Sequence, residues 1–177
     1  MSKKFGFELL HQQVVDYVDG ELMWMINERE TGDSEIEKLF FLALLFRTQF
    51  GLTEYVTLLK PADEAMESRL MCDCPDPQVS LIVRPQAQIG DYRVDFLVHA
   101  LSIRSPGDNR AWRRLVVECD GHNFHERTKE QAAKDRARDR WLTSNDYDVF
   151  RFTGSELWRN PMACAEQVTD WAVKGWF

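Results

Sequence analysis

Two carboxylates end an apolar run in the stretch LVVECDGHNFHER, residues 115–127. Side chains alternate along a strand, so Glu118 and Asp120 should share one face while Cys119 points to the other. Burying a lone carboxylate is costly unless a cation or hydrogen-bond donors compensate it. The run therefore predicts a compensating group at the end of this strand.

A third carboxylate, Asp95, lies in the β-rich run YRVDFLV on the same face as Arg93. If the two strands are neighbours, Asp95, Glu118 and Asp120 converge. Several carboxylates with nearby water suit Mg²⁺ (or Mn²⁺), a hard cation with oxygen ligands, which activates water for attack on a phosphate ester. The alternative is that Asp95 and Glu118 cap strands or pair with Arg93 and Arg113. Spacing alone does not decide between the two.

A zinc site is a weaker interpretation of the same region. Cys119, His122 and His125 have the spacing Cys-x₂-His-x₂-His. Structural zinc takes four ligands in a closed geometry, and Cys119 is expected on the face opposite the carboxylates. Cys72 and Cys74 are too close in sequence for a standard zinc knuckle.

The elements that must position these residues form an α/β pattern. Ser34 with Glu37 three residues later predicts a capping box that starts an apolar helix. Ile89-Gly90-Asp91 predicts a hairpin. We expect one mixed sheet with a crossover helix before its last strand; its strands lie near 79–86, 91–99, 113–119 and 147–152, the crossover helix at 128–144, a short helix at 63–71 and a last helix at 161–173.

Composition and charge limit the protein's class. The chain has 177 residues, 44% of them hydrophobic, which favours one compact domain. No membrane span, secretory signal or disulfide framework is evident, so we expect a cytoplasmic protein with no membrane partner. The net charge of −7 argues against coating nucleic acid by bulk charge. Residues 1–80 carry most of the negative charge, so a polyanion site belongs in residues 81–177.

Three runs, QAQIGDYRVDFLV, LVVECDGHNFHERT and KDRARDRWLTSNDYDVFRFTGSEL, resemble the PD-(D/E)XK, or restriction-endonuclease-like, nuclease superfamily. More narrowly, they resemble small bacterial proteins related to very-short-patch-repair endonucleases. The resemblance covers roughly residues 34–177. It implies a four-stranded mixed sheet flanked by helices, an αβββαβ core over 33–177, after an N-terminal helical appendage at 1–32.

The resemblance also implies residue roles. Glu37 is the helix glutamate near the metal, Asp95 the motif aspartate, Glu118 the second metal ligand, and Gln86 the glutamine that precedes the hairpin. The usual Glu-x-Lys is replaced by Glu118-Cys119-Asp120, without the lysine that positions water or stabilises charge. A lysine could enter from the crossover helix instead, and His125 could act as general base. The two candidate lysines are Lys129 and Lys134.

These residues favour a Mg²⁺-dependent DNA endonuclease. The alternative is a nuclease-fold module that binds nucleic acid or a partner protein without cleaving it; a homodimer is a further option. Phosphate contacts are expected from an arginine-rich loop, comprising Arg104, Arg110, Arg113 and Arg114, and then from Lys129 and Lys134. Much of the charged helix 128–144 could instead be a solvated face with i,i+4 pairs.

Overall fold

The computed structural model describes residues 12, 32–49, 56–59, 79–102, 111–121 and 129–174. The chain divides into two compact units, Met1–Thr31 and Gly32–Phe177. The expected N-terminal helical appendage, apart from residue 12, and the expected helix at 63–71 lie outside the described residues. Within the described ranges, no helix is both long and apolar enough to cross a membrane.

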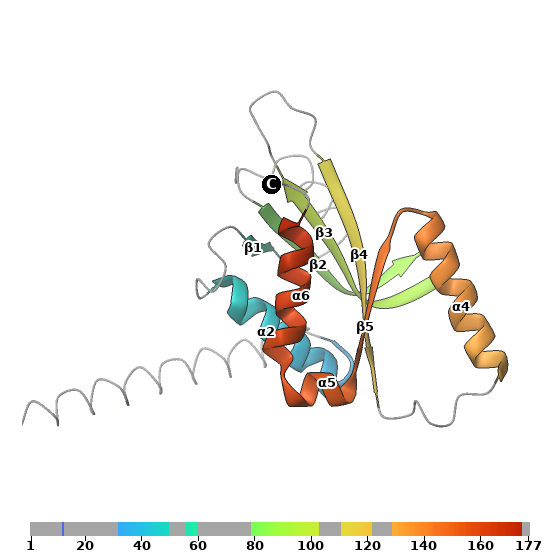
Figure 1. Ribbon diagram of the computed structural model, residues 1–177, viewed down its shortest axis with the longest axis horizontal. Coiled ribbons are helices and arrows are strands. Elements are labelled where there is room, and N and C mark those ends of the chain that lie inside the picture. The colour runs from blue at the N-terminus through green and yellow to red at the C-terminus, as the bar shows by residue number, and fades with distance from the viewer. Residues whose placement is uncertain are drawn as a thin grey trace, which may run out of the picture. The chain divides into compact units, whose positions relative to one another are not determined.

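In the described part of the chain, five strands form one mixed sheet in the order β1-β2-β3-β4-β5 (Figure 1). The antiparallel pairs are β2–β3 and β3–β4, whereas β1 runs parallel to β2 and β5 parallel to β4. The strands are β1 (Val56–Leu59), β2 (Val79–Ile89), β3 (Tyr92–Ser102), β4 (Ala111–Asp120) and β5 (Asp148–Thr153).

The predicted four-stranded mixed sheet is confirmed as β2 to β5, and β1 adds a fifth strand at its edge. Only four residues long, β1 is too short for its periodicity to distinguish it from a helix segment. The parallel strands β4 and β5 are joined through helix α4 (Lys129–Ser144), as parallel neighbours require a crossover connection. The predicted crossover helix is therefore confirmed almost to the residue.

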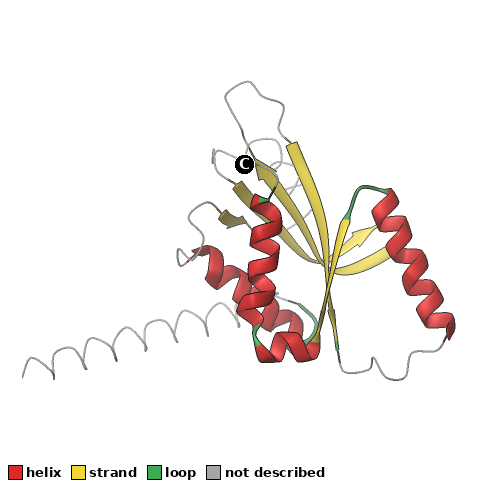
Figure 2. Ribbon diagram, viewed as in Figure 1, coloured by secondary structure: helices red, strands yellow, loops and turns green. Residues whose placement is uncertain are grey.

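Helices lie on both faces of the sheet (Figure 2). On one face lie α2 (Glu35–Gln49), α5 (Gly154–Arg159) and α6 (Pro161–Val173). Aromatic residues are buried between these helices and the sheet. The ring of Phe96 on β3 lies 5.2 Å from that of Phe40 and 6.1 Å from that of Phe41, both on α2. The short helix α5 was not predicted; a capping box at Thr153 and Glu156 starts it.

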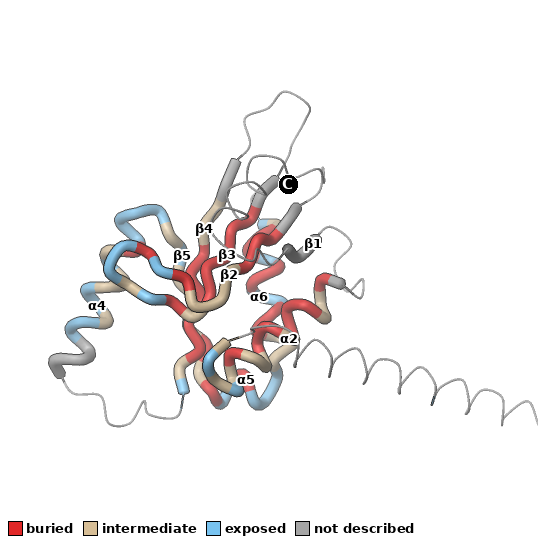
Figure 3. Tube along the Cα trace, turned by 180° about the vertical axis from the view of Figure 1, so that it is seen from behind, coloured by how far each residue is buried: buried red, intermediate tan, exposed pale blue. Residues whose placement is uncertain are grey.

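On the other face, α4 packs through Leu142, which is fully buried, and through the partly buried Trp141. Their core includes Val116 of β4 and Leu97 of β3. The rest of α4 is largely exposed, whereas the centres of β2, β3 and β4 are buried (Figure 3). Since Val116 faces α4, strand alternation directs Glu118 and Asp120 toward the same helix.

The β2–β3 hairpin has an interruption in its middle. Gln86 has a positive φ of 51°, a conformation that is uncommon for residues other than glycine. At that point the ladder omits Gln86 and the residue opposite it, Asp95; the pairs on either side are Pro85 with Phe96 and Ala87 with Val94. The ladder is thus interrupted where two of the expected site residues, Gln86 and Asp95, face each other.

Candidate functional site

Glu37 is held at the start of α2 by its own helix terminus. The side-chain hydroxyl of Ser34 donates to Glu37 Oε1 at 2.6 Å, and the Asp33 backbone N–H donates to Oε2 at 2.8 Å. The Glu37 N–H in turn donates to Ser34 Oγ at 3.3 Å. The predicted pairing of Ser34 and Glu37 is confirmed, although the carboxylate reaches the N–H of Asp33 rather than that of Ser34. A carboxylate is also favoured at this positive end of the helix dipole.

Gln86 connects this helix terminus to the hairpin. Its Nε2 atom donates to Glu37 Oε2 at 2.5 Å, across 49 residues of sequence. Glu37 is buried, so its oxygens are satisfied by protein donors. The unusual backbone of Gln86 therefore accompanies a side-chain contact to the acidic cluster, and backbone outliers of this kind concentrate at functional sites.

Asp95 lies in the centre of the acidic cluster. Its Oδ2 atom accepts the backbone N–H of Cys119 at 2.7 Å. Burial raises the pKa of Asp95, the Cys119 N–H lowers it, and the charges of Glu37 and Asp120 raise it further. The three carboxylates therefore act on one another electrostatically. The β3–β4 ladder ends at the pair of Phe96 with Val117, so Asp95 and Glu118 are the next residues along the two strands.

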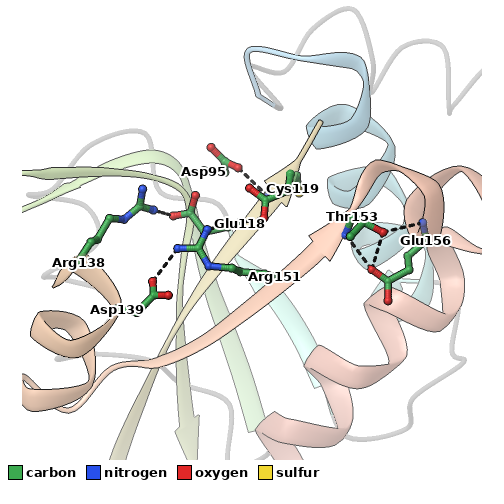
Figure 4. A network of polar contacts seen from close by, with 9 residues as sticks. Asp95, Glu118, Cys119, Arg138, Asp139, Arg151, Thr153 and Glu156 are labelled. Carbon is green, nitrogen blue, oxygen red and sulfur yellow. Dashed lines mark hydrogen bonds and ion pairs between the residues drawn. The ribbon is translucent and has the colours of Figure 1, made fainter. Parts of the chain in front are cut away.

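Glu118 is ion-paired with Arg138 of α4 (Figure 4). Both side chains are largely shielded, with 9% of Glu118 and 19% of Arg138 exposed. Burial lowers the pKa of Arg138, and the nearby charge of Arg151 lowers it further. The compensating group expected at the end of the apolar strand is thus a guanidinium from the crossover helix.

Arg151 supplies a second cation from β5, where its backbone pairs with Glu118. A nitrogen of its guanidinium lies 3.7 Å from Asp120 Oδ2. Another lies 2.6 Å from Asp139 Oδ1 (Figure 4). The carboxylates of Glu37, Asp95, Glu118, Asp120 and Asp139 still outnumber the guanidinium groups of Arg138 and Arg151. A divalent cation would reduce the repulsion among these carboxylates.

Sequence reasoning missed Arg138 and Arg151. The sequence did contain a signal for Arg138. This residue precedes the buried Leu142 by four positions, which places both on the sheet-facing side of α4. Of the two lysines proposed to replace the missing motif lysine, Lys134 is exposed. The Lys129 side chain, His122 and His125 lie outside the described residues.

Cys119 faces away from the carboxylates. Its side chain is buried, and its thiol interacts electrostatically with Cys164 of α6. Burial raises the pKa of the Cys119 thiol, and the charges of Asp95 and Glu37 raise it further. Cys119 thus lies on the face opposite the carboxylates, as strand alternation predicts.

The two described arginines of the expected binding loop lie on β4 and contact other parts of the protein. Arg113 donates to the carbonyl oxygens of Trp171 and Lys174 and stacks on the Trp171 ring. Arg114 donates to the Asn145 carbonyl at 3.0 Å. As neighbours on one strand they point to opposite faces, so they do not form one surface. Arg104 and Arg110 lie outside the described residues.

The carboxylate oxygens of Asp95, Glu118 and Asp120 match the hard donors that Mg²⁺ takes. In the described ranges, however, no three His, Cys, Asp or Glu side chains are grouped so as to hold a metal ion. The ion pair of Glu118 with Arg138 offers a physical reason. The donor chemistry fits a divalent cation, and Glu118 would have to exchange its protein partner to bind one.

A family model named REase_MTES_1575, of a restriction-endonuclease-like family, matches residues 78–171. The matched stretch covers more than half of the chain and includes Gln86, Asp95, Glu118, Asp120 and Arg138. The chain belongs to this restriction-endonuclease-like family. The predicted superfamily is thereby confirmed. No curated protein matches the chain.

Among solved structures, the Legionella pneumophila effector protein RavZ, in complex with human LC3B, is similar with a TM-score of 0.27 and 13% identity. The similarity covers 67% of this chain and 38% of the RavZ chain. This chain therefore matches less than half of that protein, and a TM-score this low does not indicate a shared fold.

Proposed function

We propose that this restriction-endonuclease-like protein is a metal-dependent DNA endonuclease, related to the very-short-patch-repair type. The observation that carries the proposal is the meeting of carboxylates from separate elements. Glu37 comes from α2, Asp95 from β3 and Asp120 from β4, and the charges of the other two both act on Asp95. Mutually repelling, partly buried carboxylates in one place are typical of functional sites.

The residues have distinct roles in this proposal. Asp95, Glu118 and Asp120 would hold Mg²⁺ or Mn²⁺, which supplies an activated water and neutralises charge on the phosphate when bound. The Cys119 N–H fixes the orientation of the Asp95 carboxylate through its 2.7 Å hydrogen bond. Gln86 fixes Glu37 beside the cluster. His125, Lys129 and Lys134 remain candidates for proton transfer or phosphate contact.

One observation favours a second function, a nuclease-fold module that binds nucleic acid or a partner protein without cleaving it. Glu118 already has a cation partner in Arg138. In a catalytically inactive protein such a pair would be a permanent structural link between α4 and β4. The two functions differ in whether a metal ion can displace that partner.

Cleavage tests the proposal directly. Purified protein is incubated with supercoiled plasmid and with single-stranded DNA in Mg²⁺, Mn²⁺ or EDTA. We expect metal-dependent nicking or linearisation that is abolished in Asp95→Asn and in Glu118→Gln. Asp91→Asn is the matched control, since Asp91 lies in the same hairpin but is exposed, and it should cleave as the wild type does.

The outcome separates the two functions. Cleavage that survives Glu118→Gln would rule out the carboxylate site. Absence of cleavage with every metal, together with retained DNA binding, would favour the non-cleaving module.

A further inference from the structure

Arg138 is bound on one side only. Its guanidinium meets Glu118, but its Nε–H has no hydrogen-bond partner among the described residues although that atom is buried. A buried donor left unsatisfied is costly. A guanidinium carries its donors in a planar fork, and Glu118 takes only part of the fork of Arg138. Among the described residues, nothing supplies the acceptor that this donor lacks.

The surroundings of Arg138 indicate what that acceptor is. Arg151 lies close enough for its charge to affect Arg138, so two guanidinium groups border the acidic cluster. Planar guanidinium groups bind phosphate oxygens through paired hydrogen bonds. The neighbouring arginines on α4, Arg136 and Arg140, are exposed and lack this placement. Arg138 is therefore the α4 arginine positioned beside the carboxylates rather than on the solvent side.

We propose that Arg138 is a phosphate-binding residue that exchanges Glu118 for a phosphate group of the nucleic acid. This inference rests on the proposed function, since it assumes a phosphodiester at the acidic cluster. A divalent cation held by Glu118 would leave the guanidinium of Arg138 available to the phosphate. Arg138 would then contribute, from α4, the positive charge that a lysine two residues after Glu118 would have contributed from β4.

The competition between Glu118 and phosphate can be measured without metal or cleavage. In EDTA, binding of a fluorescein-labelled DNA duplex is followed by anisotropy for wild type, Glu118→Gln, Arg138→Gln and the double variant. If Glu118 withholds Arg138 from the phosphate, Glu118→Gln tightens binding about tenfold, because one charge-assisted hydrogen bond is gained. The dependence of the DNA affinity on salt concentration also becomes steeper in Glu118→Gln, by about one unit of slope.

The double variant distinguishes this role from simple removal of negative charge. We expect Glu118→Gln to bring no gain of affinity in the Arg138→Gln background. If the two effects instead add, Arg138 serves only Glu118 and the inference is wrong. Arg140→Gln is the matched control: its effect on affinity should be the same with Glu118 or Gln at position 118.

Two further readouts keep the test decisive. If Arg138→Gln does not fold, as judged by circular dichroism, Arg138→Lys replaces it; lysine keeps the charge but lacks the fork, so the gain from Glu118→Gln should shrink. The plasmid assay is scored separately. Additive binding effects in a protein that cleaves overturn this inference alone, whereas coupled effects in a protein that never cleaves overturn the nuclease proposal alone.

Discussion

Arg138 and Glu118, which are 20 residues apart in sequence, form an ion pair that links α4 to the end of β4. The pair places a fixed cation against one of the carboxylates that would bind a metal ion. It also explains how an acid at the end of a buried strand is accommodated, since a charge in such a place needs a partner. In the proposed enzyme, metal binding and this ion pair would therefore compete for the same carboxylate.

This competition predicts that Arg138→Gln binds Mn²⁺ more tightly than the wild type. Glu118 no longer has to give up a charge-assisted hydrogen bond before it coordinates, so we expect a gain of about tenfold. Isothermal titration calorimetry with Mn²⁺ measures it. Arg140→Gln, on the exposed side of the same helix, should match the wild type, and equal affinities in all three proteins would contradict the competition.

Asp95→Asn should stabilise the protein at neutral pH. Burial raises the pKa of Asp95, so the folded state favours the protonated acid, and the wild type loses stability as the pH rises from 3.8 through the raised value. Asparagine removes that loss and keeps an oxygen for the Cys119 N–H. The advantage should vanish below about pH 3.8, the ordinary value for the acid.

Urea unfolding at a series of pH values measures the effect of Asp95→Asn, with Asp91→Asn as the exposed control. If Asp95 contributes to a metal site, Mg²⁺ should also raise the unfolding midpoint of the wild type more than that of Asp95→Asn. A variant less stable than the wild type at neutral pH would contradict this prediction, because it would show that the ionised Asp95 carboxylate stabilises the folded protein.

Gly32→Ala should destabilise the protein and disturb Glu37. Gly32 has a φ of +140°, and an added Cβ would lie 2.5 Å from Glu37 Cβ and 2.8 Å from its Oε2. Strained backbone at such a position costs about 1–3 kcal/mol, and the steric overlap adds to it. Urea denaturation measures the change. In the control Gly121→Ala, the new Cβ meets its nearest neighbour at an ordinary 3.9 Å.

Arg113→Ala should lower stability rather than DNA affinity. The Arg113 side chain holds the end of α6 through the carbonyls of Trp171 and Lys174 and lies 4.5 Å from the Trp171 ring centroid. We expect a loss of about 1–3 kcal/mol in the free energy of unfolding. Arg136→Ala, at an exposed position, is the control. Weaker DNA binding by Arg113→Ala at unchanged stability would support the phosphate-contact interpretation of this residue instead.

The order of elements was predictable because local signals agree with one another. Ser34 and Glu37 mark a helix start, Gly90 a hairpin, and alternating apolar residues the strands, so β2 to β5, α4 and α6 lie where the sequence indicates. Such signals act over a few residues and need no tertiary partner. The short elements β1 and α5 escaped because too few residues carry their pattern.

The acids of the candidate site could also be proposed from the sequence, because alternation assigns Asp95, Glu118 and Asp120 to faces and neighbouring strands bring faces together. The cation with which each acid pairs was not evident from the sequence. Eight charged residues, five basic and three acidic, lie on the crossover helix from Lys129 to Arg140, and their local spacing permits several i,i+4 pairs.

The pairing of Arg138 with Glu118, and the place of Arg151 between Asp120 and Asp139, were decided by the tertiary structure. Packing of Leu142 against the sheet sets the rotation of α4, and this rotation selects the arginine that faces the strand. Similarly, Arg113 and Arg114 are equivalent as charges in the sequence, but strand alternation and the helices on each face give them separate partners. Long-range packing, rather than composition, assigned each charge its role.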